Sequence, residues 1–455
     1  MPRPVSPAVV VACLCLLTAC GNGSTPNPSP PGGDVGETIT GRERIGWDQQ
    51  ASSPAELATF RYAIYVDGTR SEIADVSCSA TVGASGFPCS GRLPPMSNGT
   101  HMLELASFVD AGGIVESARS AAFRVTVAGL DPGTTTALAT GDVVTTADGV
   151  QLLADIRFER LTEPTAAVVA PDGRVFIGTT SGTVIVKDDA ALGPTQATDG
   201  AVMALALSPT FADDGYIYVA QVITSESGAR LFRIARYRDF GSHLGGRMVV
   251  LESGPTAAIP SAAVRFGPDG KLYVAFDDGG SAITAARMSE WSGKVLRLEP
   301  DGRTPSDQAA ASPVLFRGLT SPRGLDWTLD GSALWLADAS RDGIERLRVI
   351  MTTSERPRRA AQRGTFTMPT GLGPAGLTFY RSDAIRELTG DLLVAGREGG
   401  YILRVRFDPQ DRGRPLSTER LLEGRVSTVR ALTVGPDGAI YFCTDTALIR
   451  LIKAG

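Results

Sequence analysis

The stretch Pro268-Asp-Gly-Lys-Leu-Tyr-Val-Ala, residues 268–275, joins a tight Asp-Gly turn to an apolar, aromatic strand. Units with an Asp-Gly or Gly-Asp turn before such a strand occur six times, and their turn glycines lie 42, 55, 61, 59 and 48 residues apart. Glycine supplies the positive φ of such turns without strain. Because a four-stranded blade needs about 40 to 50 residues plus loops, the repeat predicts a six-bladed β-propeller. The turn glycines are Gly173, Gly215, Gly270, Gly331, Gly390 and Gly438.

The repeats extend over residues 150–455, which we assign to the propeller. The strand Ala154-Asp-Ile-Arg-Phe-Glu-Arg-Leu precedes the first repeat. A propeller closes when strands from the two ends of the chain share a blade. We therefore expect residues 154–161 to join the last blade.

Residues 37–128 predict a small β-sandwich before the propeller, so the expected fold class is all-β. The stretches 61–68, 101–110 and 121–127 each alternate in the manner of a strand. Trp47, the central tyrosines and the Gly-Thr-His strand entry resemble fibronectin type III or related immunoglobulin-like modules. We expect a spacer or adhesive role. Residues 129–149, rich in Thr, Gly and Ala, are interpreted as a linker.

The first residues have the character of a targeting segment. Arg3 is their one charge, and the apolar run 9–19 is too short for a permanent membrane helix. Leu17-Thr-Ala-Cys-Gly resembles a bacterial lipobox, which implies removal of residues 1–19 and lipidation of Cys20. An ordinary signal peptide with an incidental cysteine is the alternative. Residues 20–36 predict a flexible tether, so we expect a membrane-anchored, extracytoplasmic lipoprotein of the periplasm, outer membrane or cell surface.

Composition and cysteines narrow the function classes. The net charge of -5 argues against a nucleic-acid partner. With two histidines and no paired cysteine ligands, the chain predicts no structural zinc or other metal site. Export permits disulfides, and we expect Cys78 and Cys89 to pair because they lie eleven residues apart in one loop-rich stretch. Cys443 lies in an apolar strand and is expected to be a buried, inert thiol.

Several ordered motifs resemble the soluble, quinone-dependent glucose/sorbosone dehydrogenases. Residues 266–280 and 292–302 are similar to the family's FGPDGKLYV-TGDGG…GKILRL--DG. Residues 321–327 resemble NPQGLAW, and residues 375–380 and 390–395 resemble SGLAFY…GDLFVG. The resemblance implies a propeller that uses pyrroloquinoline quinone (PQQ) and calcium. It also implies a histidine base on the sugar C1 hydroxyl, an arginine near the quinone and cations for the cofactor's carboxylates.

The positions that the resemblance equates with working residues are altered. Ile259 stands at the place of the histidine base, and an aliphatic side chain cannot accept a proton. Leu319 and Thr320 replace the His-Arg pair of GHRNPQG. The segment 337–345 aligns with EHGP…DE-N, which supplies backbone to calcium, but lacks the Gly-Pro pair.

Four candidate site residues remain, each with an alternative. Asp278 is the first catalytic candidate, or else a cap of the turn formed with Gly279 and Gly280. Arg397 and Arg430 are candidates for binding the cofactor, or else salt-bridge residues between blades. His243, in a near copy of the base motif, is the alternative base or a coincidence.

Two functions therefore stay open. The first is an exported PQQ-dependent sugar oxidoreductase, with a sugar as substrate and the membrane reached through the lipid anchor. The second is a non-catalytic propeller that binds a glycan, peptide or protein partner. A calcium-dependent lactonase is a third, weaker hypothesis, because the sequence lacks its acidic and asparagine ligand set.

Overall fold

The computed structural model describes residues 18–19, 37–39, 44–73, 76–94, 96, 99–110, 114–127, 137–187, 192–308, 312–340, 343–352, 360–369, 371–408 and 415–454. These residues form two compact units by their contacts: the first contains the described residues up to 127 and residues 415–419, and the second contains the other described residues from 137 onward. Cys20, the predicted tether and most of the predicted signal lie outside the described residues. Within the described ranges, no helix combines the length and apolar character needed to cross a membrane.

The first unit is a β-sandwich with a shared core. One sheet has the order β1 (Thr18–Ala19), β3 (Arg44–Gln49), β7 (Phe87–Arg92), β6 (Ser77–Cys78). The other runs β2 (Glu37–Ile39), β10 (Phe123–Val127), β8 (Gly99–Asp110), β4 (Arg61–Val66), β5 (Thr69–Glu72), and β9 (Ile114–Glu116) pairs with β8. Trp47 of the first sheet packs against Tyr62 of the second, with ring centroids 4.7 Å apart. A short helix, α1 (Pro54–Leu57), connects β3 to β4.

The cysteine predictions are confirmed. Cys78 and Cys89 form a disulfide between the neighbouring strands β6 and β7. Cys443 is a buried free thiol, and burial raises its pKa to about 12. Such a thiol stays protonated and unreactive near neutral pH.

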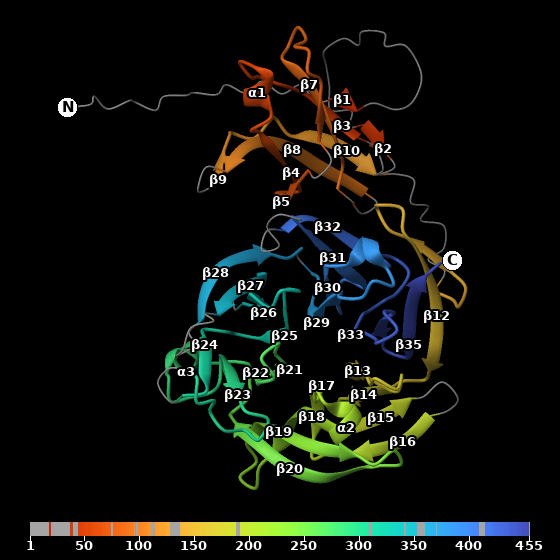
Figure 1. The fold of residues 1–455 in the computed structure, drawn as a ribbon, viewed down its shortest axis with the longest axis vertical. Coiled ribbons are helices and arrows are strands. Elements are labelled where there is room, and N and C mark those ends of the chain that lie inside the picture. Colours follow the sequence, from red (N-terminus) through yellow and green to blue (C-terminus); the bar gives the residue numbers. More distant parts are fainter. Residues whose placement is uncertain are drawn as a thin grey trace, which may run out of the picture. The chain divides into compact units, whose positions relative to one another are not determined.

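The second unit is the predicted propeller. Its described residues form six sheets, which we call blades 1 to 6, arranged in a ring (Figure 1). Blade 1 contains β13 (Pro164–Val169), β14 (Val175–Thr179), β15 (Thr183–Lys187) and β16 (Leu192–Ala197). Blade 2 contains β17 (Ala201–Leu207), β18 (Tyr216–Thr224), β19 (Arg230–Asp239) and β20 (Leu244–Ser253). Blade 3 contains β21 (Ala262–Phe266), β22 (Leu272–Phe276), β23 (Lys294–Leu298) and β24 (Val314–Arg317).

The other three blades complete the ring. Blade 4 contains β25 (Pro322–Trp327), β26 (Ala333–Ala339), β27 (Glu345–Thr352) and β28 (Ala360–Thr367). Blade 5 contains β29 (Pro374–Phe379), β30 (Leu392–Gly396), β31 (Tyr401–Phe407) and β32 (Pro415–Leu421). Blade 6 has the order β33 (Ala431–Val434), β34 (Ile440–Cys443), β35 (Ala447–Lys453), β12 (Gln151–Glu159), β11 (Val143–Thr145). Short helices α2 (Phe211–Asp214), α3 (Ala282–Ala286) and η2 (Arg386–Leu388) lie between strands.

The predicted closure of the ring is confirmed. Strand β12 pairs antiparallel with β35, from Leu152 opposite Lys453 to Glu159 opposite Ala447. The range interpreted as a linker contains β11, which extends this blade by pairing Val143 with Leu153. Its Thr- and Gly-rich composition concealed the strand, because the partner strand rather than local preference stabilises it.

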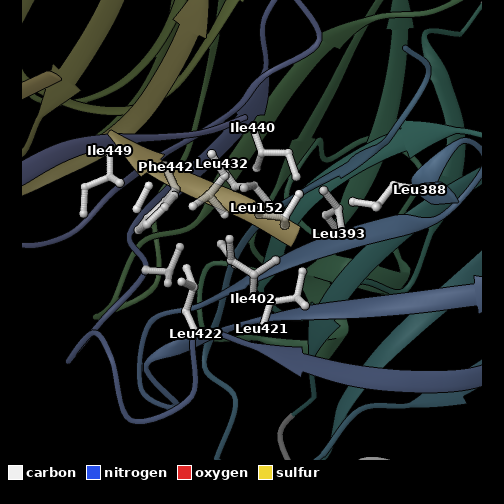
Figure 2. Close-up of a cluster of buried hydrophobic side chains, with 14 of the residues drawn as sticks. Leu152, Leu388, Leu393, Ile402, Leu421, Leu422, Leu432, Ile440, Phe442 and Ile449 are labelled. Carbon is white, nitrogen blue, oxygen red and sulfur yellow. The ribbon is translucent and has the colours of Figure 1, made fainter. Parts of the chain in front are cut away.

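Apolar side chains fill the spaces between blades, and all six turn glycines have the predicted positive φ. Figure 2 shows one such core, where side chains of blades 5 and 6 meet. Large buried residues on facing sheets bury their apolar area against each other, which is the main stabilising term of such a ring. Labelled members of this core include Leu152, Leu393, Ile402, Leu432, Ile440 and Phe442.

Candidate functional site

The six first strands, β13, β17, β21, β25, β29 and β33, lie innermost in the ring (Figure 1). They line a central channel with a cavity of about 290 Å³. Alanine and glycine supply much of its wall. Of the described residues that line the cavity, Arg265 and Arg323 are the charged ones. Any ligand of this channel therefore meets small side chains and positive charge.

One end of the channel gathers three arginines. A second cavity of about 70 Å³ lies where the inner strands begin, and residues of all six blades line it. Arg323 lies near the start of β25, Arg397 follows β30, and Arg430 precedes β33. We call this end the arginine mouth. The structure thus brings together the predicted cofactor residues Arg397 and Arg430 and adds Arg323.

Positive charge at the arginine mouth is incompletely balanced. Arg430 forms a salt bridge with Asp445, and Arg397 lies 3.5 Å from the exposed Glu398. Arg323 forms no salt bridge with any described residue. Burial lowers the pKa of the Arg323 guanidinium and the Arg397 charge lowers it further, while the charges of Asp277, Glu398 and Glu345 oppose the shift. An anion placed between these guanidiniums would relieve their repulsion.

Asp277 fixes the loops on the blade 3 side of the mouth. Its buried carboxylate accepts hydrogen bonds from the backbone N–H groups of Ala257, Ser261 and Gly279, each at 2.9 Å. These bonds tie the loop before β21 to the loop after β22. Burial raises the pKa of Asp277, although the three donors oppose that shift. With its acceptor positions occupied, Asp277 is a positioning residue.

Asp278 has the geometry of a turn cap. Its Oδ1 accepts the backbone N–H of Gly280 at 2.8 Å, and the residue is almost fully buried. Neither the channel cavity nor the cavity at the mouth has Asp278 among its lining residues. The observed contact is therefore the turn cap that the sequence offered as the alternative to a catalytic role for Asp278.

The altered family positions differ in accessibility. Ile259 lies in the loop before β21 and is 68% exposed. Leu319 is 1% exposed and packs in the core between blades 3 and 4. Thr320 accepts the backbone N–H of Asp278 through its carbonyl oxygen, and its own N–H donates to Asp338. The position that the sequence resemblance equates with the family base thus carries an exposed apolar side chain.

His243 lies away from the arginine mouth. It follows β19 in the hairpin that leads to β20, the two outer strands of blade 2, and stacks on Phe240 with centroids 5.1 Å apart. In an antiparallel blade, this hairpin and the start of the inner strand lie at opposite ends. The structure therefore does not bring His243 together with Arg397 and Arg430.

Two residues at this end were not singled out from the sequence. Arg323 stands where the resembled motif NPQGLAW has glutamine. This replacement of a neutral residue by a cation could have marked Arg323 as a candidate site residue from the sequence. Glu345 ends the segment compared with the calcium motif, and both its carboxylate oxygens accept the N–H of Gly373, at 2.9 and 3.2 Å. Burial raises the pKa of Glu345, and the charge of Glu398 adds to this rise.

The residues of the mouth fit PQQ better than calcium. Three guanidiniums suit a ligand with several carboxylates, because a guanidinium pairs with a carboxylate through two parallel hydrogen bonds. The described residues contain no cluster of three or more His, Cys, Asp or Glu side chains arranged for a metal ion.

Comparison with known proteins assigns the family. The family described as Glucose / Sorbosone dehydrogenase matches residues 161–453. The chain belongs to this family. An uncharacterised protein of Synechocystis is 24% identical over 320 residues, which are 61% of this chain and 76% of that one. The aldose sugar dehydrogenase YliI of Escherichia coli is 22% identical over 241 residues, 47% and 60% of the two chains.

Solved structures share the fold. The soluble aldose sugar dehydrogenase of Escherichia coli, in its apo form, superposes with a TM-score of 0.59 at 17% identity, covering 67% of this chain and 100% of that one. The PQQ-bound aldose sugar dehydrogenase of Streptomyces coelicolor superposes with a TM-score of 0.54 at 19% identity, covering 67% of this chain and 99% of that one. A putative oxidoreductase (glucose dehydrogenase) of Thermus thermophilus superposes with a TM-score of 0.56 at 25% identity, covering 66% of this chain and 100% of that one.

Proposed function

We propose that the propeller binds PQQ at the arginine mouth and oxidises an aldose sugar there. One observation carries this proposal: Arg323, Arg397 and Arg430, from blades 4, 5 and 6, meet at one cavity in a chain of the glucose/sorbosone dehydrogenase family. PQQ-bound structures among the neighbours make this cofactor the natural occupant of such a site.

The protein's own residues would bind and orient in this proposal. Arg323 and Arg397 would hold the carboxylates of the cofactor, and Asp277 would keep the blade 3 loops in place beside it. When bound, PQQ supplies the acceptor for a hydride from the sugar C1. The base is the unusual part. Asp278, the carboxylate retained from the family motif, stays our proposed proton acceptor on the sequence resemblance alone, because it caps a turn and lines neither cavity. Asp278→Asn should then abolish sugar oxidation and leave PQQ binding unchanged; full activity of this variant would remove Asp278 as the base.

A second candidate is binding without turnover. The exposed Ile259 at the place of the family base favours it, because no proton acceptor stands there. This second candidate, a propeller that binds a glycan, peptide or protein partner, does not require PQQ. The discriminating measurement is therefore sugar-dependent dye reduction by protein incubated with PQQ, with and without added calcium. Dye reduction supports the oxidoreductase. Binding without dye reduction supports the second candidate, in which case Ile259→His should create activity.

We also propose an exported, lipid-anchored location, motivated by the lipobox-like sequence before Cys20. On this proposal residues 1–19 are removed, residues 20–36 are a tether, and the sandwich is a fibronectin-like spacer that precedes the propeller in the sequence. Cys20→Ala should move the protein from the membrane fraction to the soluble fraction. Equal membrane recovery of both forms would contradict the anchor.

A further inference from the structure

A second charged group adjoins the channel, and its member Arg265 lines the channel cavity. Arg265 of β21, Asp326 of β25 and Arg381, which follows β29, form what we call the channel cluster. Asp326 Oδ1 lies 3.1 Å from Nε of Arg265. Arg381 binds the same carboxylate with both terminal nitrogens, at 2.8 and 2.9 Å. Two guanidiniums thus share one carboxylate.

The single negative charge of the Asp326 carboxylate cannot neutralise both Arg265 and Arg381. This carboxylate is 1% exposed and also accepts the backbone N–H groups of Trp327 and Phe379, at 2.8 and 2.7 Å. The channel cluster therefore keeps one net positive charge. Burial lowers the pKa of Arg265, and the neighbouring Arg381 lowers it further while Asp326 opposes the shift.

The excess charge faces open space. The Arg265 side chain is 36% exposed and lines the cavity of about 290 Å³. Arg381 is 40% exposed. No described lining residue of that cavity is a carboxylate, so nothing on the channel wall offsets Arg265 from that side. The backbone of Arg265 lies three residues beyond Ala262 of the mouth, which is about 10 Å further along β21. Arg323 of the mouth lines the same cavity of about 290 Å³.

We infer that the channel cluster is an anion site, separate from the arginine mouth, that takes a small carboxylate or an inorganic oxyanion at Arg265. A guanidinium presents paired N–H donors that match the oxygens of such an anion. The cavity has room for one, and its small side chains leave Arg265 accessible. Asp326, which anchors Arg265, stands where the resembled motif NPQGLAW has alanine.

Calorimetric titration of the full-length protein with sodium acetate, and separately with sodium sulfate, tests the site. We expect saturable binding that Arg265→Gln weakens at least about tenfold, and that Asp326→Asn strengthens because the competing carboxylate is lost. Arg303→Gln is the matched control, since Arg303 is an exposed turn residue. Binding of acetate alone assigns a carboxylate site, and binding of sulfate as well assigns a general oxyanion site. Loss of affinity in Arg303→Gln equal to that in Arg265→Gln would overturn the inference.

A measurement on the unaltered protein guards against misfolded variants. Crystals soaked in bromide should show anomalous density beside Arg265, in addition to any density at Arg323 or Arg397. Density confined to the arginine mouth, or none in the channel, would contradict a separate site. Because this readout requires neither PQQ nor sugar, its failure is distinguishable from failure of the proposed function.

Discussion

The spaces between the blades and the mouth of the channel are built on opposite principles. Between blades 4 and 5, the fully buried Trp335 contacts Phe407 and Phe379, with ring centroids 5.0 and 6.3 Å apart. At the mouth, three arginines line a cavity, and in the loop before β21 Ile259 is exposed to solvent. The motifs that resemble the family lie in the blades, whereas the resemblance equates the family's working positions with Ile259, Leu319 and Thr320. Fold and chemistry are thus carried by separate residues of one chain.

The largest effect should come from emptying a space between blades. Trp335→Ala removes a buried indole and should lower the free energy of unfolding by about 3–5 kcal/mol. Thermal denaturation followed by circular dichroism would measure it. Phe240→Ala, on an exposed outer hairpin, is the control and should change little. Equal losses in the two variants would mean that the packing between blades is not the main support of the ring.

Acid should loosen the contact between blade 5 and the closing segment. Arg404 is buried and binds both oxygens of Asp148, at 2.9 and 3.0 Å. Burial alone would raise the pKa of Asp148, but the bonds from Arg404 and Thr146 and the nearby arginine charges lower it to about 2.

Because this pKa is below the ordinary 3.8, ionised Asp148 stabilises the fold above about pH 4. That contribution, about 2 kcal/mol, should disappear as pH falls from 3.8 towards 2. Unfolding free energies of wild type and Asp148→Asn, measured between pH 5 and 2, should therefore converge at the acid end. Parallel curves over this range would show that Asp148 is not stabilised by Arg404.

Two substitutions that restore the family's histidines should differ in their effect on stability, because one position is buried and the other is exposed to solvent. Leu319→His places a polar ring in the core between blades 3 and 4 and should cost about 1–3 kcal/mol. Ile259→His, at an exposed loop position, should change stability by less than about 0.5 kcal/mol. Denaturation of both variants would check this order. If Leu319→His left the free energy of unfolding unchanged, position 319 would be open to the arginine mouth and not part of the core.

Local turn chemistry and periodic apolar strands made the propeller and its closure predictable. Each turn glycine, such as Gly270, needs only its own neighbours to require a positive φ. The site was less accessible to sequence reasoning. Arg323, Arg397 and Arg430 meet because three blades place them at one end of a ring, and Arg265 meets Asp326 and Arg381 in the same way. Such contacts depend on how blades pack around the axis, which spacing along the chain does not encode.

The most direct test of this account is calorimetric titration of PQQ into wild-type protein and into Arg323→Gln and Arg397→Gln. We predict saturable binding to the wild type and a loss of affinity of about tenfold or more in each variant, since each loses a charge-assisted pair. Arg303→Gln should bind as the wild type does. Absence of binding to the wild type, or unchanged affinity in both mouth variants, would contradict a quinone site at the arginine mouth.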